Sequence, residues 1–311
     1  MRKINISGGL SVSAIALGAM NFGTSTQKDE AFNILDKYLD FGGNFIDTSN
    51  NYAHWQGTGD ESETLLGEWF KKSGKRERVV LATKVGFDRH GVGAGLKKEQ
   101  IEFWVDQSLR KLQTDYIDLY YAHTDDMNTP IEETLETFDN LVKKGKVRVL
   151  GASNFDTWRI AESNMLAKSK GQTQYTVVQQ KFSYLTPKFG RAPKYTFNEH
   201  VNRERLRFLK EKDIPLVAYS CLCKGGYENV SRLPNDYELS GRYQAIKDMA
   251  KEKGLSVSAM VLSYLMSLSK LENYPQIIPL FSSSEKHVLE NLRSTQLELD
   301  IEELQFLNSI E

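Results

Sequence analysis

Hydrophobic residues recur at helical spacing in some segments and form short continuous runs in others, which predicts helices that alternate with strands. Residues 27–41 show the helical spacing most clearly, because Ala31, Ile34, Leu35, Tyr38 and Leu39 fall on one face before Gly42-Gly43 ends the helix. Short apolar runs predict strands at residues 14–17, 44–47, 79–83, 116–122, 147–151, 175–179, 214–219 and 277–279. Helices are predicted at residues 27–41, 61–72, 97–112, 130–144, 156–167, 199–212, 241–253, 257–268, 285–292 and 301–310.

This order of elements predicts an α/β fold, a (β/α)8 TIM barrel, because parallel strands need helical crossovers. A short N-terminal β-hairpin around Gly8-Gly9 and extra C-terminal helices complete it, and residues 183–200 are expected to form a long surface loop. No low-complexity tract divides the chain, so residues 1–311 are predicted to form a single domain. A doubly wound open sheet is the alternative, but Gly18 and Gly23 give only G-x-x-x-x-G where its nucleotide fingerprint would be G-x-G-x-x-G.

Composition narrows the classes of function. Hydrophobic residues make up 40% and charged residues 26%, as in ordinary globular proteins. The 40 basic and 41 acidic residues leave a net charge of −1, which argues against nucleic acid or anionic membrane as a partner. The chain shows neither an apolar run of about 18–20 residues nor a signal-peptide core, so a cytoplasmic location is expected. Cys221 and Cys223 lack the further ligands that zinc requires, so no metal site is predicted.

Polar residues stand at the ends of three consecutive predicted strands. Asp47 ends the second strand, Lys84 the third and His123 the fourth, and Tyr52 follows Asp47 across a polar turn. Because the carboxyl ends of barrel strands meet at one mouth, we expect these four side chains to lie together. Taken singly, each has an ordinary explanation as a stray acid in a turn, a barrel ion pair, a core histidine or a capping aromatic. Their convergence favours a site for proton transfer to a carbonyl group.

The four side chains complement one another chemically. A tyrosine, with a pKa of about 10, is a poor acid or base at neutral pH unless a nearby cation favours its phenolate, and Lys84 can supply that cation. A buried ammonium group needs a counter-charge, which Asp47 can provide. His123 can hydrogen-bond a carbonyl oxygen and hold it near the Tyr52 hydroxyl.

The sequence around these residues resembles the aldo-keto reductase superfamily. An ordered series of matches covers nearly the whole chain and is far more specific than a single motif. The matching stretches are Phe45-Ile46-Asp47-Thr48-Ser49 with Tyr52, Leu81-Ala82-Thr83-Lys84, Asp118-Leu119-Tyr120-Tyr121-Ala122-His123, Gly145-Lys146-Val147-Arg148, Gly151-Ala152-Ser153-Asn154-Phe155, Val178-Gln179 and Val217-Ala218-Tyr219-Ser220-Cys221-Leu222.

The resemblance implies a barrel enzyme that interconverts a carbonyl compound (an aldehyde, ketone or aldose) and an alcohol by hydride transfer, with NADP (NADPH) as cofactor and NAD as the alternative. It assigns proton donation to Tyr52, tuning of the Tyr52 pKa to Asp47 and Lys84, and orientation of the carbonyl to His123. An amide needs both donors and acceptors to fix one ring face, which suits Ser153, Asn154 and Gln179 to the nicotinamide carboxamide. Further implied cofactor contacts are Gly18, Met20, Tyr219 (stacked on the nicotinamide ring), Ser220 and Leu222. The structural alternative for Ser153-Asn154 is a helix N-cap.

Near the C-terminus, residues 278–284 and Glu290-Asn291 resemble the family segment that grips the adenosine half of the cofactor. The residues assigned to it are Ser282, Ser283, His287, Glu290 and Asn291. The chain departs from the family pattern here, because Phe281 stands where glycine or a basic residue is frequent and His287 where an arginine commonly meets the 2′-phosphate. Serine hydroxyls and a helix N-terminus can still bind a phosphate, so NADP is the first choice.

Loops over the mouth are expected to select a small-molecule carbonyl substrate, with Phe22 and Trp55 in its lining. Aromatic walls with few charges suit a neutral or sugar-like compound, but the sequence does not separate sugars from aromatic aldehydes, dicarbonyls or ketosteroids. A non-catalytic nucleotide-sensing subunit on the same scaffold is the alternative function. A barrel hydrolase or metal-dependent lyase ranks last, since it would want several carboxylates or histidines at strand ends.

Overall fold

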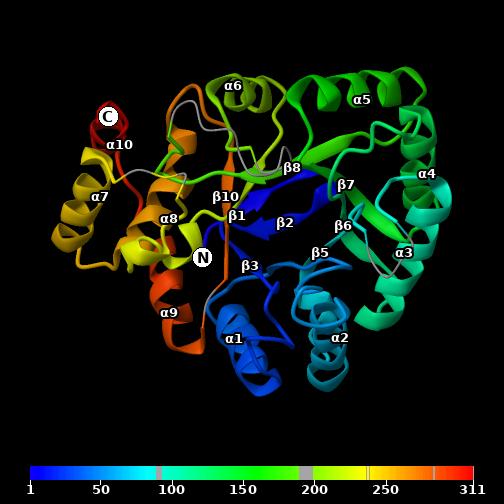
Figure 1. Ribbon diagram of the computed structural model, residues 1–311, viewed down its shortest axis with the longest axis horizontal. Helices are drawn as coiled ribbons and strands as arrows, with labels where there is room; N and C mark the ends of the chain where they lie inside the picture. The colour runs from blue at the N-terminus through cyan, green and yellow to red at the C-terminus, as the bar shows by residue number, and fades with distance from the viewer. Residues whose placement is uncertain (89–92, 189–198, 236, 238, 283, 311) are drawn as a thin grey trace.

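The computed structural model describes residues 1–88, 93–188, 199–235, 237, 239–282 and 284–310 as a ring of strands surrounded by helices (Figure 1). The strands are β1 Lys3–Asn5, β2 Ser11–Ser13, β3 Ala16–Gly18, β4 Phe45–Asp47, β5 Val80–Val85, β6 Ile117–Ala122, β7 Val147–Ser153, β8 Tyr175–Lys181, β9 Leu216–Tyr219 and β10 Ile277–Phe281. The α-helices are α1 Lys28–Asp40, α2 Glu61–Ser73, α3 Lys98–Leu112, α4 Ile131–Lys143, α5 Thr157–Ser169, α6 Arg203–Glu211, α7 Gly241–Glu252, α8 Val257–Ser267, α9 Glu285–Arg293 and α10 Ile301–Ser309. Short 3-10 helices include η1 Ser7–Gly9, η2 Arg76–Arg78, η4 Cys223–Gly225, η5 Val230–Arg232, η6 Leu268–Lys270 and η7 Ser294–Gln296.

Eight parallel strands form a closed barrel in the order β10-β3-β4-β5-β6-β7-β8-β9. The last strand closes the barrel against the first, with Leu280 paired to Ala16 and Phe281 to Leu17. Every residue of β5 and β6 is buried, because their outer faces are covered by helices and their inner faces fill the barrel. The (β/α)8 prediction is confirmed, and the open doubly wound sheet is excluded.

The predicted N-terminal hairpin is present. Strands β1 and β2 are antiparallel, and the buried Ile4 pairs with the buried Val12. Gly8 and Gly9 turn the chain with φ of 68° and 71°, values that favour glycine. The Ser13 amide donates to Asn44 Oδ1 at 2.7 Å, immediately before β4. The hairpin therefore lies at the amino-terminal end of the barrel and leaves the opposite mouth free.

Most predicted boundaries differ from the structure by one or two residues, and two of the differences have a clear physical reason. The helix expected from residue 199 begins at Arg203. Asn202 is its N-cap and accepts a hydrogen bond from the Arg205 amide at 2.8 Å, whereas His200 forms a β-bridge with Lys181. Strand β10 extends two residues beyond the predicted 277–279, since Leu280 and Phe281 pair with β3. Of the expected loop at residues 183–200, residues 189–198 lie outside the described residues.

Helices α7 and α10 lie outside the ring, at the left of Figure 1, and are among the extra C-terminal helices that were predicted. The Arg242 guanidinium on α7 donates to the Ile310 carbonyl just after α10, at 3.1 Å. Among the described residues, no helix is long and apolar enough to cross a membrane.

Candidate active site

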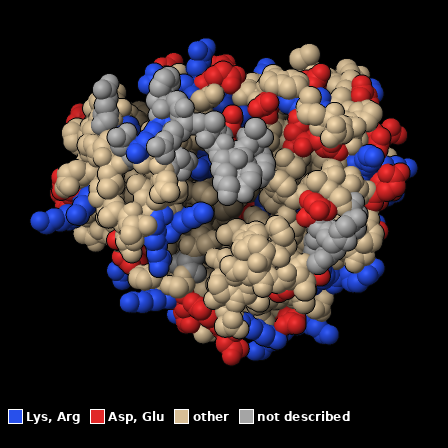
Figure 2. All heavy atoms as spheres, in the orientation of Figure 1, with Lys and Arg blue, Asp and Glu red and all other residues tan. Residues whose placement is uncertain are grey.

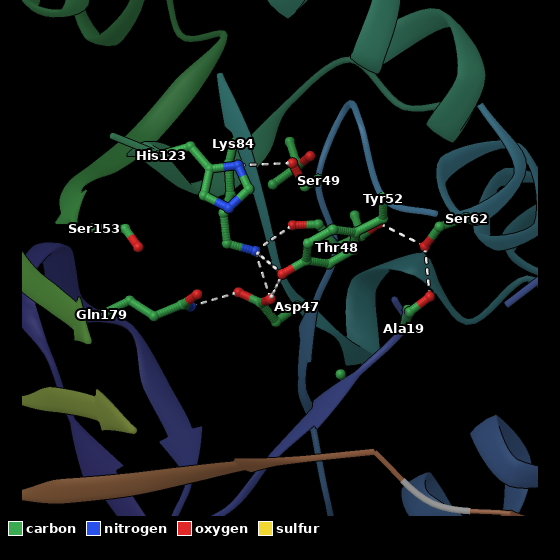
Figure 3. A network of polar contacts seen from close by, with 12 residues as sticks. Ala19, Asp47, Thr48, Ser49, Tyr52, Ser62, Lys84, His123, Ser153 and Gln179 are labelled. Atoms are coloured by element: carbon green, nitrogen blue, oxygen red, sulfur yellow. Dashed lines mark hydrogen bonds and ion pairs between the residues drawn. The ribbon is translucent and has the colours of Figure 1, made fainter. Parts of the chain in front are cut away.

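Asp47, Lys84 and Tyr52 meet in a buried cluster at the carboxyl ends of β4 and β5 (Figure 3). Lys84 lies two residues beyond Ala82, the register partner of Asp47, so both side chains reach the same region of the barrel. Lys84 Nζ lies 2.5 Å from Asp47 Oδ1 and donates to the Tyr52 hydroxyl and the Thr48 carbonyl, each at 2.6 Å. The Tyr52 hydroxyl in turn donates to Asp47 Oδ1 at 2.9 Å.

Burial sets the acid–base properties of this cluster. It raises the pKa of Tyr52 well above 10.0, and the Asp47 carboxylate, which repels a phenolate, raises that pKa further. Burial lowers the pKa of Lys84 from 10.5, and the contact with Asp47 opposes the change. The stabilisation of the phenolate that was expected from Lys84 is outweighed by burial and by Asp47, so Tyr52 keeps its proton at neutral pH.

His123, directly after β6, is held by its backbone and its ring. Its amide donates to the Val85 carbonyl at 2.7 Å, and its carbonyl accepts from Asn154 Nδ2 at 2.8 Å. The ring packs edge-on against Phe87 with centroids 4.6 Å apart, and lies 6.0 Å from the Tyr52 ring. Burial first and the Lys84 charge second lower the pKa of His123 well below 6.5, so its imidazole is neutral.

Four residues predicted to hold the nicotinamide join the same network. Gln179 on β8 donates from Nε2 to Asp47 Oδ2 at 2.8 Å. Asn154, after β7, has a φ of 59°, a left-handed conformation that asparagine tolerates. Its amide donates to Ser153 Oγ at 3.1 Å and accepts from the Tyr219 hydroxyl at 2.7 Å. The N-cap of α5 is Asp156, so Ser153 and Asn154 are not the cap of that helix.

The loop after β3 is tied to the cluster through hydroxyl groups. Ser62 Oγ, on the first turn of α2, lies 2.7 Å from Thr48 Oγ1 and donates to the Ala19 carbonyl at 2.8 Å. Ala19 stands between the predicted cofactor contacts Gly18 and Met20. A Cβ at Gly18 would lie 3.0 Å from Ser282 Oγ, which itself donates to the Gly18 carbonyl at 3.3 Å. Gly18 and Ser282 are therefore direct neighbours.

The segment after β9 turns sharply. Ser220 has a φ of 54°, in the left-handed region, and Leu222 precedes η4. The buried Cys221 thiol donates to the Leu280 carbonyl at 3.3 Å, and burial raises its pKa. This thiol is packed as a structural group between β9 and β10.

Of the residues predicted for the adenosine half, His287, Glu290 and Asn291 lie on α9, and Ser282 directly follows β10. His287 is exposed, and its Nδ1 lies 3.4 Å from Glu290 Oε2, whereas Asn291 is buried. Ser283 lies outside the described residues. The first amide of α9, from Glu285, donates to Glu30 Oε1 at 3.1 Å, so a carboxylate already occupies part of this helix N-terminus. The sequence contained no signal for this contact, which joins residues far apart in the chain.

The two predicted substrate-lining aromatics differ in environment. Phe22 is 2% exposed and packs in the core, whereas Trp55 is 57% exposed and stacks edge-on against His54 with centroids 5.2 Å apart. The face seen in Figure 2 is hollowed near its centre, and Lys and Arg side chains lie beside the hollow on the side of α8 and α9. In the described part of the chain, no group of three His, Cys, Asp or Glu residues could hold a metal ion.

Sequence reasoning missed four contacts of the site: the Thr48 carbonyl on Lys84, Ser62 behind Thr48, Ser49 against His123 Nδ1 at 3.1 Å, and the Phe87 ring. A backbone carbonyl leaves no trace in a sequence. Ser49 did stand in the stretch that carries Asp47 and Tyr52, and its place two residues after a strand end was the available signal.

Comparisons with known proteins match this architecture. The family model of the aldo/keto reductase family matches residues 14–311. Norsolorinic acid reductase stcV of Emericella nidulans is 31% identical, over 95% of this chain and 77% of the relative. Aldo-keto reductase ausK of Aspergillus calidoustus is 29% identical, over 99% and 81%. Aryl-alcohol dehydrogenase GME11368 of Pestalotiopsis microspora is 27% identical, over 98% and 80%.

The solved structures include an aldo/keto reductase from Klebsiella pneumoniae in complex with NADP and acetate. It superimposes with a TM-score of 0.75 and 26% sequence identity, and the match covers 99% of this chain and 94% of that one. The family model spans nearly the whole chain, and the relatives match it over most of their own length. The chain therefore belongs to the aldo/keto reductase family and is an oxidoreductase of that family.

Proposed function

We propose that the protein reduces aldehydes or ketones, and oxidises the corresponding alcohols, with NADP as its cofactor and Tyr52 as the proton donor. The observation that carries this proposal is the Tyr52 hydroxyl, which keeps its proton yet lies 2.6 Å from the Lys84 ammonium group. The NADP in the Klebsiella pneumoniae structure supports the cofactor assignment.

The polar groups near Tyr52 suit a nicotinamide carboxamide. Ser153, Asn154 and Gln179 together offer hydroxyl, amide N–H and amide carbonyl groups, the mixed donors and acceptors that a carboxamide requires. Tyr219, tied to Asn154, can present its ring to the nicotinamide. The Lys and Arg side chains beside the hollow in Figure 2 favour an anionic cofactor. When bound, NADPH supplies the hydride.

The residues of the chain then transfer one proton. Tyr52 donates its hydroxyl proton to the carbonyl oxygen as negative charge develops there, and Lys84 stabilises the phenolate that remains. Asp47 keeps the buried Lys84 charged. His123, which is neutral, donates an N–H to the same carbonyl oxygen and orients it. In the oxidation direction the Tyr52 phenolate accepts the proton again.

For the substrate class, we propose aromatic carbonyl compounds. The relatives named norsolorinic acid reductase and aryl-alcohol dehydrogenase support this choice. The Phe87 ring, packed edge-on against His123, places an aromatic surface beside the residue that would orient the carbonyl. In a carbonyl panel we expect aryl aldehydes and ketones to give a higher kcat/KM than aldoses, measured by NADPH oxidation.

The test of the mechanism is Tyr52→Phe, which removes the hydroxyl and keeps the ring. We expect turnover with the best substrate of the panel to fall by about 10²–10⁴-fold, the usual contribution of general acid–base catalysis, while NADPH binding is retained. Tyr116→Phe, at the amino-terminal side of β6, is the matched control and should leave turnover unchanged. Near-normal turnover of Tyr52→Phe would refute its assignment as proton donor.

Cofactor choice has its own measurement, the quenching of intrinsic fluorescence by NADPH and by NADH in parallel. We expect tighter binding of NADPH. Equal affinities would contradict recognition of a 2′-phosphate by the α9 region. A nucleotide-sensing subunit, the alternative function, would bind NADPH but turn over none of the panel.

A further inference from the structure

Ser49 contacts the ring of His123 at Nδ1. It lies in the loop between β4 and Tyr52 and is fully buried. Its Oγ lies 3.1 Å from His123 Nδ1 and 2.8 Å from Asn51 Oδ1. The other ring nitrogen, Nε2, has no hydrogen-bond partner among the described residues, and Figure 3 shows it facing the side where Lys84 and Tyr52 lie.

A neutral imidazole carries one N–H, and the position of that hydrogen decides what His123 can do. A carbonyl oxygen only accepts hydrogen bonds, so orienting it requires the hydrogen on Nε2. Nδ1 then presents a lone pair and needs a donor, and the Ser49 hydroxyl is the described group within reach. With the hydrogen on Nδ1 instead, two lone pairs would face each other at the substrate.

Asn51 has the larger influence on the single Ser49 hydroxyl proton, because its Oδ1 lies 2.8 Å from Ser49 Oγ and Asn50 Oδ1 lies 3.5 Å away. If the Asn51 amide presents its oxygen to Ser49, that oxygen competes with Nδ1 for the proton. If the amide turns about its Cβ–Cγ bond, its NH2 group donates to Ser49 Oγ at the same position. The hydrogen bonds then run in one direction, from Asn51 to Ser49 to His123.

We propose that Ser49 is a positioning residue whose hydroxyl, supported by the Asn51 amide, donates to His123 Nδ1 and so selects the tautomer that presents Nε2–H to the substrate carbonyl. The proposal rests on the proposed function of His123 as the group that orients the carbonyl. The same hydrogen bond also fixes the rotation of the ring, as outer contacts fix the histidine ligands of metal sites.

The direct test is the tautomer itself, read from two-bond ¹H–¹⁵N correlation spectra of the full-length, ¹⁵N-histidine-labelled protein at pH 8. We expect Nε2–H in the wild type, a mixture of tautomers in Ser49→Ala, and recovery of Nε2–H in Ser49→Thr, which keeps a hydroxyl. Asn51→Asp replaces the amide by a group that can only accept, so the Ser49 proton is drawn away and the hydrogen should move to Nδ1.

The kinetic test follows carbonyl reduction in the same variants. We expect Ser49→Ala to lower kcat about tenfold, the effect of roughly one hydrogen bond, with NADPH affinity unchanged, and Ser49→Thr to restore most of it. Ser108→Ala, at another fully buried serine on α3, is the matched control and should change neither readout. A wild-type Nδ1–H tautomer, or a Ser49→Ala protein with the wild-type tautomer and turnover, would overturn the proposal. A wild type that holds Nε2–H through Ser49 but reduces no carbonyl compound would instead overturn the proposed function and support tautomer selection.

Discussion

At the level of single residues, Lys84 and Asp47 show how burial and charge oppose each other. Both side chains are 0% exposed, so each charge loses its hydration and depends on the other. Asp47 also accepts from Tyr52 and Gln179, which satisfies its remaining lone pairs. The pair is therefore costly to break at one side, and less costly to remove as a whole.

Lys84→Met tests this dependence. We expect the free energy of unfolding, from urea denaturation at pH 7, to fall by about 3–5 kcal/mol because Asp47 is left as an uncompensated buried charge. The double variant Lys84→Met/Asp47→Asn should lose less than Lys84→Met alone. As control, Lys143→Met removes an exposed partner of Asp139 and should cost at most about 1 kcal/mol. If the double variant loses as much free energy of unfolding as Lys84→Met and Asp47→Asn lose in sum, the two residues do not depend on each other.

His200 should make the free energy of unfolding depend on pH in the acid range. Its Nε2 accepts from the Ser183 amide at 3.1 Å, and burial lowers its pKa to about 4. Because the pKa of His200 is lower in the folded state, the unfolded chain binds its proton first as pH falls below about 6.5. The contribution of neutral His200 to the free energy of unfolding is therefore fully present above pH 6.5. It falls by about 2–3 kcal/mol as the pH is lowered to 4.

We expect His200→Gln, which cannot titrate in this range, to flatten that part of the pH dependence in urea denaturation between pH 7 and pH 4. The comparison with wild type isolates His200, since all other titrating groups are shared. Parallel curves for the two proteins would contradict the assignment.

The sequence predicted which residues meet at the site better than it predicted their protonation. Asp47 ends β4, Lys84 is the second-last residue of β5 and His123 directly follows β6, and the order of these neighbouring strands alone brings the three residues together. The direction of the Tyr52 pKa shift depends on the acceptor of its hydrogen bond and on its burial, which residue order does not reveal. The contact of Glu30 with the start of α9 was hidden for the same reason.

At the level of elements, apolar spacing predicted all eight barrel strands and the helices between them. The errors lie at the ends of helices and strands, where individual hydrogen bonds determine the boundary. Asn202 caps α6 and sets its start at Arg203, four residues later than the apolar pattern suggested. Pairing with β3 extends β10 to Phe281, a contact between the two ends of the barrel that no local pattern encodes.

Packing between α2 and α3 gives a prediction at this level. A Cβ at Gly67 on α2 would lie 2.0 Å from the Lys111 carbonyl oxygen and 2.9 Å from the Leu112 carbonyl carbon, so the two helices would have to separate. Alanine favours a helix by about 1 kcal/mol over glycine, but overpacking typically costs about 1–3 kcal/mol. We expect Gly67→Ala to lower the Tm in circular dichroism melts, with the exposed Lys71→Ala on the same helix as a near-neutral control. A raised Tm for Gly67→Ala would show that helix propensity outweighs this contact.

At the level of the whole molecule, the fold, the family and the oxidoreductase class predicted from the sequence are confirmed. The barrel cannot close without both ends of the chain, because β3 pairs with β4 on one side and with β10 on the other. The two halves of the chain thus share one sheet, which supports the prediction that residues 1–311 form one domain.

The positions of the tryptophans make that prediction testable. All four, Trp55, Trp69, Trp104 and Trp158, lie in the first 158 residues, whereas helices that dominate far-ultraviolet circular dichroism extend to α10. If both halves unfold together, the urea transitions from tryptophan fluorescence and from circular dichroism should coincide in midpoint and slope. A fluorescence transition that precedes the dichroism transition would show that the first half unfolds separately, and closure through β3 and β10 would then not couple the two halves.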